Sequence, residues 1–219
     1  MDANASQLAS HDTSTVSDAL DRLGIAGQCL GIKPLDRSFR LAGRAFTVRM
    51  VPVGQSAGSV GDYIDDVAPG EIVVLDNDSR LDTTIWGDLA TCVAHLRGVG
   101  GTVIDGVCRD VARSLEFAYP VFSRGNAMRT GKDRVTADAL GVTVQIAGVR
   151  VDPGDLLLGD ADGVVVVPRQ REDEVLGAAG EIAAVEARIL EAVGGGMRLD
   201  EARRRHGYHR LQSRTSDIG

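Results

Sequence analysis

Short apolar runs, separated by turns rich in glycine and proline, predict a series of strands through most of the chain. Weak alternation of apolar and polar residues over 40–53 favours one long strand. The compact apolar runs at 72–75 and 164–167 are typical of buried strands. The polar stretch 76–86 is interpreted as a loop, and further strands are predicted at 102–104, 120–124, 142–146 and 156–158.

Helical periodicity occurs near both ends of the chain and between the predicted strands. Residues 14–23 form one such segment, in which Thr15-Val16-Ser17-Asp18 resembles a capping box and Gly24 ends the pattern. The remaining helical predictions are a short helix at 59–67, a helix at 87–97, a long helix from 171 to about 193 and, after a glycine hinge at 194–196, a short basic helix at 199–206.

The order of these elements indicates a mixed α/β fold. Strands and helices alternate in the middle of the chain, but strands cluster between 120 and 167, which does not suit a doubly wound sheet. We expect an α/β core with an N-terminal helix over residues 1–170 and a C-terminal helical extension over 171–212. The polar tail at 213–219 is expected to be disordered.

Composition narrows the class of protein. The 24 basic and 31 acidic residues give a net charge of −7, so direct binding of nucleic acid is not expected. No apolar run is long enough to cross a membrane, and the polar N-terminus does not have the layout of a signal peptide. The three cysteines form no Cys-x-x-Cys pair, which favours reduced thiols in a cytoplasmic protein.

The segment Trp86-Gly87-Asp88-Leu89-Ala90 opens one of the predicted helices. The first N–H groups of a helix have no partner within the helix, and they favour an anion together with the helix dipole. Gly87 allows the backbone to come close to a ligand. We therefore predict an anion-binding helix start here, although a plain helix cap is the simpler alternative.

A second polar motif, Asp105-Gly106-Val107-Cys108-Arg109-Asp110, follows the strand at 102–104. Ligands of α/β folds bind at the carboxyl ends of strands. Arg109 can hold a carboxylate with two hydrogen bonds, and Asp110 can hold Mg²⁺ or Mn²⁺ through oxygen. Taken alone, an Arg-Asp dipeptide is more often a surface ion pair.

Other polar groups are weaker candidates, each with a simpler structural interpretation. An acidic stretch could form either a second metal site or a solvated turn. Asp105 could be a metal ligand or could cap the turn at Gly106. Cys108 could be reactive or merely buried. The acidic stretch consists of Asp76, Asn77, Asp78 and Asp82. Near the C-terminus, His206 and His209 are candidate ligands or bases, and Arg203-Arg204-Arg205 is a candidate RNA contact. All of these also suit a solvated helix end.

The two motifs together resemble the RraA-like family, which includes the 4-hydroxy-4-methyl-2-oxoglutarate/4-carboxy-4-hydroxy-2-oxoadipate aldolases and the regulator of ribonuclease activity A. The resemblance covers about residues 13–212. Weaker similarity lies in Thr15-Val16-Ser17-Asp18-Ala19-Leu20, in Gly159-Asp160-Ala161-Asp162-Gly163-Val164-Val165 and in Glu201-Ala202-Arg203 with Gly207-Tyr208-His209.

The resemblance implies an αββα sandwich like the phosphohistidine swivelling domain. It implies a homotrimer or hexamer, with the C-terminal extension at the subunit interface and the active sites between subunits. The implied chemistry is that of a class II pyruvate aldolase with accompanying oxaloacetate decarboxylation.

The same resemblance assigns roles to residues. Asp110 would hold Mg²⁺ or Mn²⁺, Arg109 would bind oxygens of a small 2-oxo acid, and the backbone from Gly87 through Asp88, Leu89 and Ala90 would receive its carboxylate. Glu186 of a neighbouring subunit would complete the site. One departure is Arg113, which occupies a position where the aldolase pattern has an acid, with Glu116 three residues further on.

Two hypotheses of different classes follow. The first is a metal-dependent carbon–carbon lyase that releases pyruvate. The alternative is a non-catalytic regulator that binds a ribonuclease or helicase, because an acidic chain suits a basic protein partner better than RNA. A methyltransferase is rejected, since the chain has no glycine-rich nucleotide-binding loop after a first strand.

Overall fold

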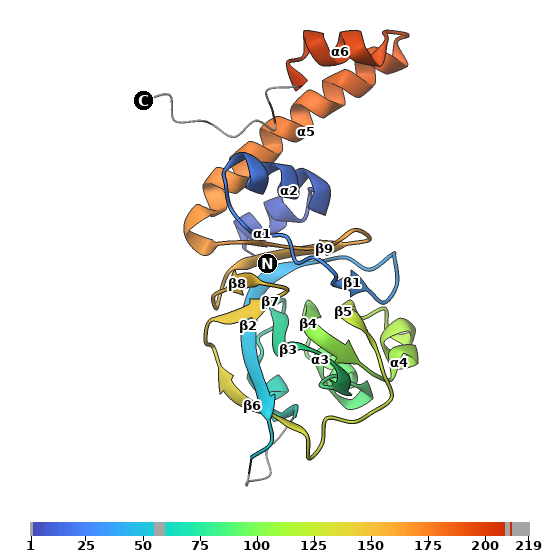
Figure 1. Cartoon of the computed structure of the whole chain (residues 1–219). Helices are drawn as coiled ribbons and strands as arrows, with labels where there is room; N and C mark the ends of the chain where they lie inside the picture. Colours follow the sequence, from blue (N-terminus) through green and yellow to red (C-terminus); the bar gives the residue numbers. More distant parts are fainter. Residues whose placement is uncertain (1, 55–59, 209–210, 212–219) are drawn as a thin grey trace.

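The computed structural model describes residues 2–54, 60–208 and 211. They form four stacked layers in the order helix, sheet, sheet, helix, and a helical arm extends from one side (Figure 1). The mixed α/β fold and the C-terminal helix are therefore confirmed. The predicted tail at 213–219 lies outside the described residues.

The main sheet is built on three parallel strands that follow β2 (Leu41–Pro52). These are β3 (Ile72–Thr84), β4 (Gly101–Cys108) and β5 (Val121–Asn126), arranged so that their carboxyl ends meet at one edge. Two antiparallel strands complete the sheet: β1 (Lys33–Pro34) beside β5, and β6 (Val135–Leu140) beside β2.

The second sheet begins at the start of β2, whose first four residues pair with β9 (Leu156–Asp160), which in turn pairs with β10 (Gly163–Val167). In β9, Leu157 faces the core between the sheets while Leu156 and Leu158 face the helices, as the two-residue period of a strand requires. The hairpin of β7 (Val144–Ile146) and β8 (Val149–Val151) adds Val144 and Ile146 to the core between the sheets.

Helices cover the outer faces of both sheets. On the main sheet lie η1 (Asp62–Asp66), α3 (Asp88–Leu96) and α4 (Val111–Glu116). On the second sheet lie α1 (Ala3–Leu8), α2 (Thr13–Arg22) and the first half of α5 (Glu172–Gly194), which the short turn η2 (Arg169–Arg171) precedes.

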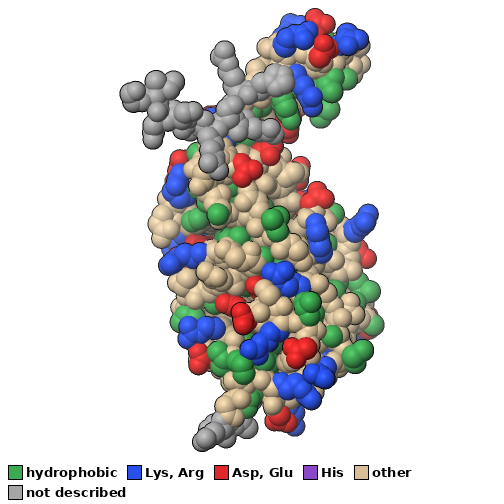
Figure 2. Space-filling view, in the orientation of Figure 1, with side chains coloured by type: hydrophobic (Ala, Val, Ile, Leu, Met, Phe, Trp, Pro, Cys, Tyr) green, Lys and Arg blue, Asp and Glu red, His purple; other side chains and the backbone are tan. Residues whose placement is uncertain are grey.

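The second half of α5 leaves this core and forms an arm with α6 (Leu199–Arg205), as Figure 1 shows. A small separate apolar cluster of Val185, Ile189 and Ala202 joins the two helices. Among the described residues, no helix is both long enough and apolar enough to cross a membrane. On the face shown in Figure 2, basic side chains are interspersed with acidic ones.

Three local predictions differ from the structure in whole or in part. The stretch 76–86 is mostly strand, because β3 continues to Thr84 through an irregularity at Asp78 and Ser79, both at positive φ. The cap of α2 is Asp12, whose carboxylate accepts the N–H of Thr15 at 2.7 Å, and not a box that starts at Thr15. The short helix expected at 59–67 is a 3₁₀ helix at Asp62–Asp66, and residues 55–59 lie outside the described chain.

Candidate active site

The start of α3 is fixed by the segment that connects it to β3. Trp86 is buried, and its indole N–H donates to Thr91 Oγ1 at 2.9 Å within the first turn of the helix. The carbonyl of Trp86 accepts the backbone N–H of Arg109 at 2.9 Å. This hydrogen bond joins the start of α3 to the segment after β4, and so brings the two predicted motifs together.

Asp110 is the residue where the two motifs meet. Its backbone is left-handed (φ 55°, ψ 40°), a conformation that aspartate tolerates better than most residues, and it precedes α4. Asp110 Oδ2 accepts the backbone N–H of Asp88 at 3.1 Å and lies 3.3 Å from Arg109 Nε. The N–H of Leu89 is taken by the Asp88 carboxylate at 2.8 Å, so protein carboxylates occupy the predicted anion site.

Gly87 provides the space for this arrangement. A Cβ atom at Gly87 would lie 2.7 Å from Asp110 Oδ2 and 3.2 Å from Arg109 Nε. The backbone of Gly87 is extended, so the need for glycine here comes from the neighbouring charges and not from the backbone conformation.

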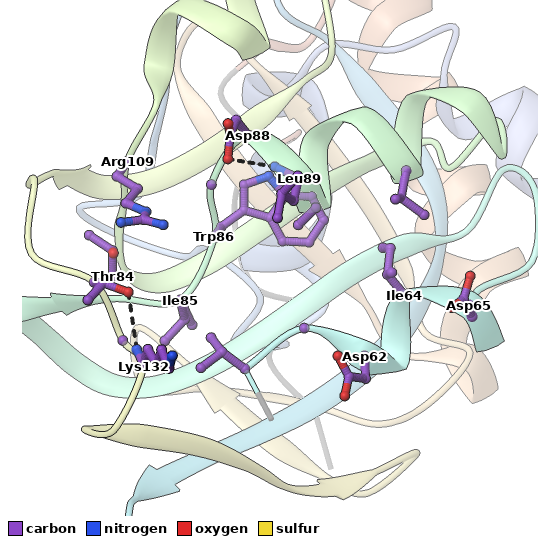
Figure 3. Close-up of a pocket in the computed structure, with 17 residues that line it drawn as sticks. Asp62, Ile64, Asp65, Thr84, Ile85, Trp86, Asp88, Leu89, Arg109 and Lys132 are labelled. Carbon is purple, nitrogen blue, oxygen red and sulfur yellow. Dashed lines mark hydrogen bonds between the residues drawn. The ribbon is translucent and has the colours of Figure 1, made fainter. Parts of the chain in front are cut away.

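These groups open into a cavity of about 560 Å³ (Figure 3). That volume lies within the range of small-molecule sites. Arg109 lines the cavity, and Asp110 lies beside it in contact with Asp88 and Arg109; 39% of each of the two side chains Arg109 and Asp110 is exposed. The apolar part of the lining comes from Val60, Ile64, Ile85, Trp86, Leu89, Ala90 and Val93.

The cavity also contains residues that the sequence motifs did not indicate. Lys132 and Thr130 line it from the loop between β5 and β6, and Asp62 lines it from η1. No residue pattern near Lys132 resembles a binding motif. Its place in the wall follows from the pairing of Thr130 with Thr84, a contact between distant parts of the chain.

Glu186 does not lie at this cavity within the chain. It lies on α5, where burial and the nearby carboxylates of Asp18 and Asp12 raise its pKa. The prediction gave this role to the Glu186 of a neighbouring subunit, and a single chain does not test it.

Asp105 is neither a turn cap nor an open metal ligand. It lies within β4, is 4% exposed, and forms an ion pair with Arg124. It also accepts hydrogen bonds from Ser79 Oγ at 3.1 Å and from the N–H of Ala147 at 2.9 Å. With three donors on its carboxylate, Asp105 joins β3, β4, β5 and the β7–β8 hairpin.

The acidic stretch after residue 75 has structural contacts instead of a shared centre. Asp76 accepts the N–H groups of Gln145 and Asp78, and Asp82 lies 3.7 Å from Arg129. Among the described residues, no group of three or more His, Cys, Asp or Glu side chains is placed to hold a metal ion together.

The remaining weak candidates also have structural surroundings. Cys108 is buried, and burial raises the pKa of its thiol, as expected for an inert cysteine. Arg113 pairs with Glu116 at 2.6 Å. His206 directly follows α6 in the arm, where Arg203 lies over the ring of Tyr208, and His209 lies outside the described residues.

A divalent cation is compatible with the donors at Asp110. One oxygen of its carboxylate is engaged by Asp88 and Arg109, and no hydrogen bond is recorded for the other among the described residues. Mg²⁺ and Mn²⁺ accept a single protein carboxylate when water and substrate oxygens supply the other ligands. Asp110 is therefore the residue that would hold such an ion.

Comparison with known proteins identifies the family. The family model described as "RraA-like: Aldolase/RraA" matches residues 13–166, and the chain belongs to this family. A "Putative 4-hydroxy-4-methyl-2-oxoglutarate aldolase" from Halalkalibacterium halodurans is 34% identical over 164 residues, which cover 75% of this chain and 76% of that protein. Protein DlpA from Legionella pneumophila is 37% identical over 205 residues, which cover 92% of this chain but only 33% of DlpA.

Solved structures agree with this assignment. An uncharacterized protein from Pseudomonas syringae has 41% sequence identity and a TM-score of 0.85, over 91% of this chain and 96% of that one. RraAS2 from Streptomyces coelicolor, described as an unusual member of the RNase ES inhibitor RraA protein family, has 27% identity and a TM-score of 0.78, over 85% and 96% of the two chains. The fold is thus the RraA-like fold.

Proposed function

We propose that this protein is a divalent-metal-dependent carbon–carbon lyase that releases pyruvate from small 2-oxo acids. The observation that carries the proposal is the contact between Asp110, Arg109 and the N–H of Asp88 at the edge of a 560 Å³ cavity. Similarity to the relative from Halalkalibacterium halodurans supports an aldolase reaction. The substrates proposed are 4-hydroxy-4-methyl-2-oxoglutarate-like acids, oxaloacetate, or both.

Substrate binding uses charges that face the cavity. Arg109 donates to the carboxylate and the 2-oxo oxygen of the substrate, since its guanidinium carries several parallel donors. The first N–H groups of α3, at Asp88, Leu89 and Ala90, add donors for the same carboxylate. To reach the N–H of Leu89, the substrate displaces the Asp88 carboxylate that accepts it in this structure.

The reaction then breaks a bond at C3 of the substrate. In retro-aldol cleavage, the C4 hydroxyl gives its proton to solvent and becomes the carbonyl group of the second product as the C3–C4 bond breaks. The electron pair of that bond passes into the 2-oxo acid as the enolate of pyruvate. In decarboxylation, the same enolate forms as CO₂ leaves. Arg109 and the start of α3 stabilise the negative charge that grows on the 2-oxo oxygen, and a proton added at C3 gives pyruvate.

A Mg²⁺ or Mn²⁺ ion held by Asp110 would supply Lewis-acid polarisation of the 2-oxo group. The carboxylate of Asp110 is oriented for such an ion by the N–H of Asp88 and by Arg109. We further propose a cytoplasmic homotrimer or hexamer in which Glu186 of one subunit completes the site of the next.

Pyruvate release from the purified protein tests this function. We expect pyruvate from oxaloacetate or from 4-hydroxy-4-methyl-2-oxoglutarate when Mg²⁺ or Mn²⁺ is present, and none when the metal is chelated. The better substrate distinguishes decarboxylase from aldolase. Turnover that is unchanged by chelation would contradict the metal dependence.

The regulator remains the second candidate, because RraAS2, at 27% identity, is described as a member of an RNase ES inhibitor family. A regulator would release no pyruvate, would bind no metal, and would capture a ribonuclease or helicase equally well with Asp110 replaced. A change at Asp110 therefore distinguishes the two candidates, because it should abolish pyruvate release by a lyase and leave partner binding by a regulator unchanged.

A further inference from the structure

Lysine is rare in this chain, and one of its two lysines lies in the cavity. Only Lys33 and Lys132 are lysines among the 24 basic residues. Lys33 lies in β1, where its ammonium donates to the carbonyl of Asp162. Lys132 lines the cavity that contains Arg109, and these two are the basic residues of its described lining.

Several contacts fix the loop that carries Lys132. Thr130 pairs with Thr84, whose N–H and hydroxyl both donate to the carbonyl of Arg129 at 3.1 and 2.7 Å. The N–H of Lys132 donates to Thr130 Oγ1 at 3.2 Å. A Cβ atom at Gly131 would lie 2.3 Å from the carbonyl oxygen of Thr84, so glycine allows the loop to pack against the end of β3.

Both basic side chains of the described cavity lining, Arg109 and Lys132, lie toward the same end of the cavity. In Figure 3, Arg109, Thr84 and Lys132 lie toward one end of the cavity, and Ile64 and Asp65 lie toward the other. Asp65 already pairs with Arg97 outside the lining. Among the described residues, no carboxylate forms an ion pair with the Lys132 ammonium.

We propose that Lys132 binds a second carboxylate of the substrate, so that the site selects dicarboxylic 2-oxo acids over monocarboxylic ones. This inference rests on the proposed function, in which Arg109 binds the 2-oxo acid end. The carboxylates of Asp62, Asp65 and Asp88 in the lining repel a second anion, so Lys132 is the basic group left to bind it once Arg109 holds the 2-oxo acid end. The apolar wall around Ile64 and Val93 then receives the uncharged substituent at C4.

Isotope labelling of the two lysines tests binding without turnover. Reductive methylation with ¹³C-formaldehyde gives one NMR signal for each lysine and one for the N-terminal amine, and Lys33→Met and Lys132→Met assign them. The probes are 2-oxoglutarate, which has two carboxylates and no 4-hydroxyl to cleave, and pyruvate, which has one. Both are added with Mg²⁺.

We expect 2-oxoglutarate to shift the Lys132 signal and to leave Lys33 unchanged, whereas pyruvate shifts neither. Equal shifts of both lysines, or an unmoved Lys132 signal at saturating 2-oxoglutarate, would overturn the inference. Because no reaction occurs, a shift confined to Lys132 would support it even if the protein released no pyruvate, and the proposed function alone would then fail.

Kinetics give a second measure. Lys132→Met should raise KM for the cleaved dicarboxylic acid about 10- to 100-fold, and Lys132→Arg should recover most of that loss. Lys33→Met is the matched control and should behave as wild type. The reference reaction is exchange of the pyruvate methyl protons with solvent, which needs no second carboxylate. If Lys132→Met slowed this exchange as strongly as cleavage, the lysine would act in the chemistry and the inference would be wrong.

Discussion

Gly87 lies where any side chain would press on the two charged groups of the site. We expect Gly87→Ala to push the Asp110 carboxylate away from the N–H of Asp88, because the new Cβ would lie 2.7 Å from Asp110 Oδ2. A small displacement of a catalytic group costs about 10- to 100-fold in kcat. The extended backbone of Gly87 accepts alanine, so thermal unfolding should change little.

Gly177→Ala is the matched control for this substitution, because Gly177 lies in α5 with no atom within 4 Å of its added Cβ. Helix propensity predicts a slight gain in stability and unchanged kcat. Steady-state kinetics and thermal unfolding of both variants check the pair. Full activity of Gly87→Ala would show that the observed position of Asp110 is not the catalytic one.

Asparagine is the most suitable replacement for testing the role of Asp110. Asparagine tolerates the left-handed backbone observed here, whereas alanine adds about 1 kcal/mol of strain. Asp110→Asn should retain the fold and lose metal-dependent pyruvate release by about 1000-fold. Mn²⁺ binding, followed by electron paramagnetic resonance, should weaken in parallel. Metal binding that is unaffected by this change would place the ion elsewhere.

For single residues, the sequence predicted only those members of the candidate site that lie in short local motifs. The start of α3 was predicted from its helical pattern, and Arg109-Asp110 was predicted from its place after an apolar strand. The two meet because β3 and β4 are adjacent parallel strands. Lys132 could not be found in this way, because the contact between Thr84 and Thr130 joins residues 46 positions apart. Asp88 is the first residue of α3 and its carboxylate accepts the N–H of Leu89, a contact that the simpler alternative of a plain helix cap describes.

Among the elements, β3 shows why polar strands escape prediction. Its later residues include Asp76, Asn77, Asp78, Arg80 and Asp82, and this polar composition led to the prediction of a loop. These residues form a strand because β4 lies beside them and because Asp76 accepts the N–H of Gln145 from β7. Tertiary pairing thus outweighs the low strand propensity of aspartate and asparagine.

The joint between α1, β2 and α5 depends on one buried ion pair. Glu172, at the start of α5, is 6% exposed and pairs with Arg44 of β2, which also holds Asp2 at 2.6 Å. Burial would raise the pKa of Glu172, but hydrogen bonds from Arg44 and Asn4 outweigh it and hold the pKa below its ordinary value of 4.5. The ionised carboxylate therefore stabilises the folded state.

Glu172→Gln should lower the free energy of unfolding by about 2 kcal/mol at neutral pH, since it leaves Arg44 without its buried partner. The lowered pKa gives the sign of the pH dependence: the stabilisation is present above pH 4.5 and is lost as the pH falls through the lower, folded-state pKa. Denaturant unfolding at pH 7 and near pH 3 measures this difference.

Glu174→Gln is the control from the same turn of α5, because Glu174 pairs with Arg171 at the surface. Its effect on the free energy of unfolding should be small at either pH, because water screens a surface ion pair. A destabilisation by Glu172→Gln that is equally large near pH 3 would show that packing, and not the charge, is what the substitution removes.

At the scale of the whole molecule, the arm formed by the second half of α5 and by α6 carries Glu186, the residue proposed to complete the site of a neighbouring subunit. The second half of α5 and α6 contact each other through Val185, Ile189 and Ala202, and Leu190 remains 71% exposed. Glu186 lies at the base of this arm, away from the cavity of its own chain. The hypothesis of a shared site therefore requires that the Glu186 of one subunit reach the Asp110 of another.

Mixing two inactive variants tests that requirement directly. We expect Asp110→Asn and Glu186→Gln each to lose activity alone, and to regain it when they are unfolded together and refolded as mixed oligomers. If subunits mix at random, one site in four combines an intact Asp110 with an intact Glu186, so about a quarter of wild-type activity should return. Light scattering establishes that the mixed particles are trimers or hexamers. If mixing restored nothing although such oligomers formed, each site would draw both residues from a single chain or would not use Glu186. Activity of Glu186→Gln alone would separate these two cases, because a residue outside the site leaves turnover intact.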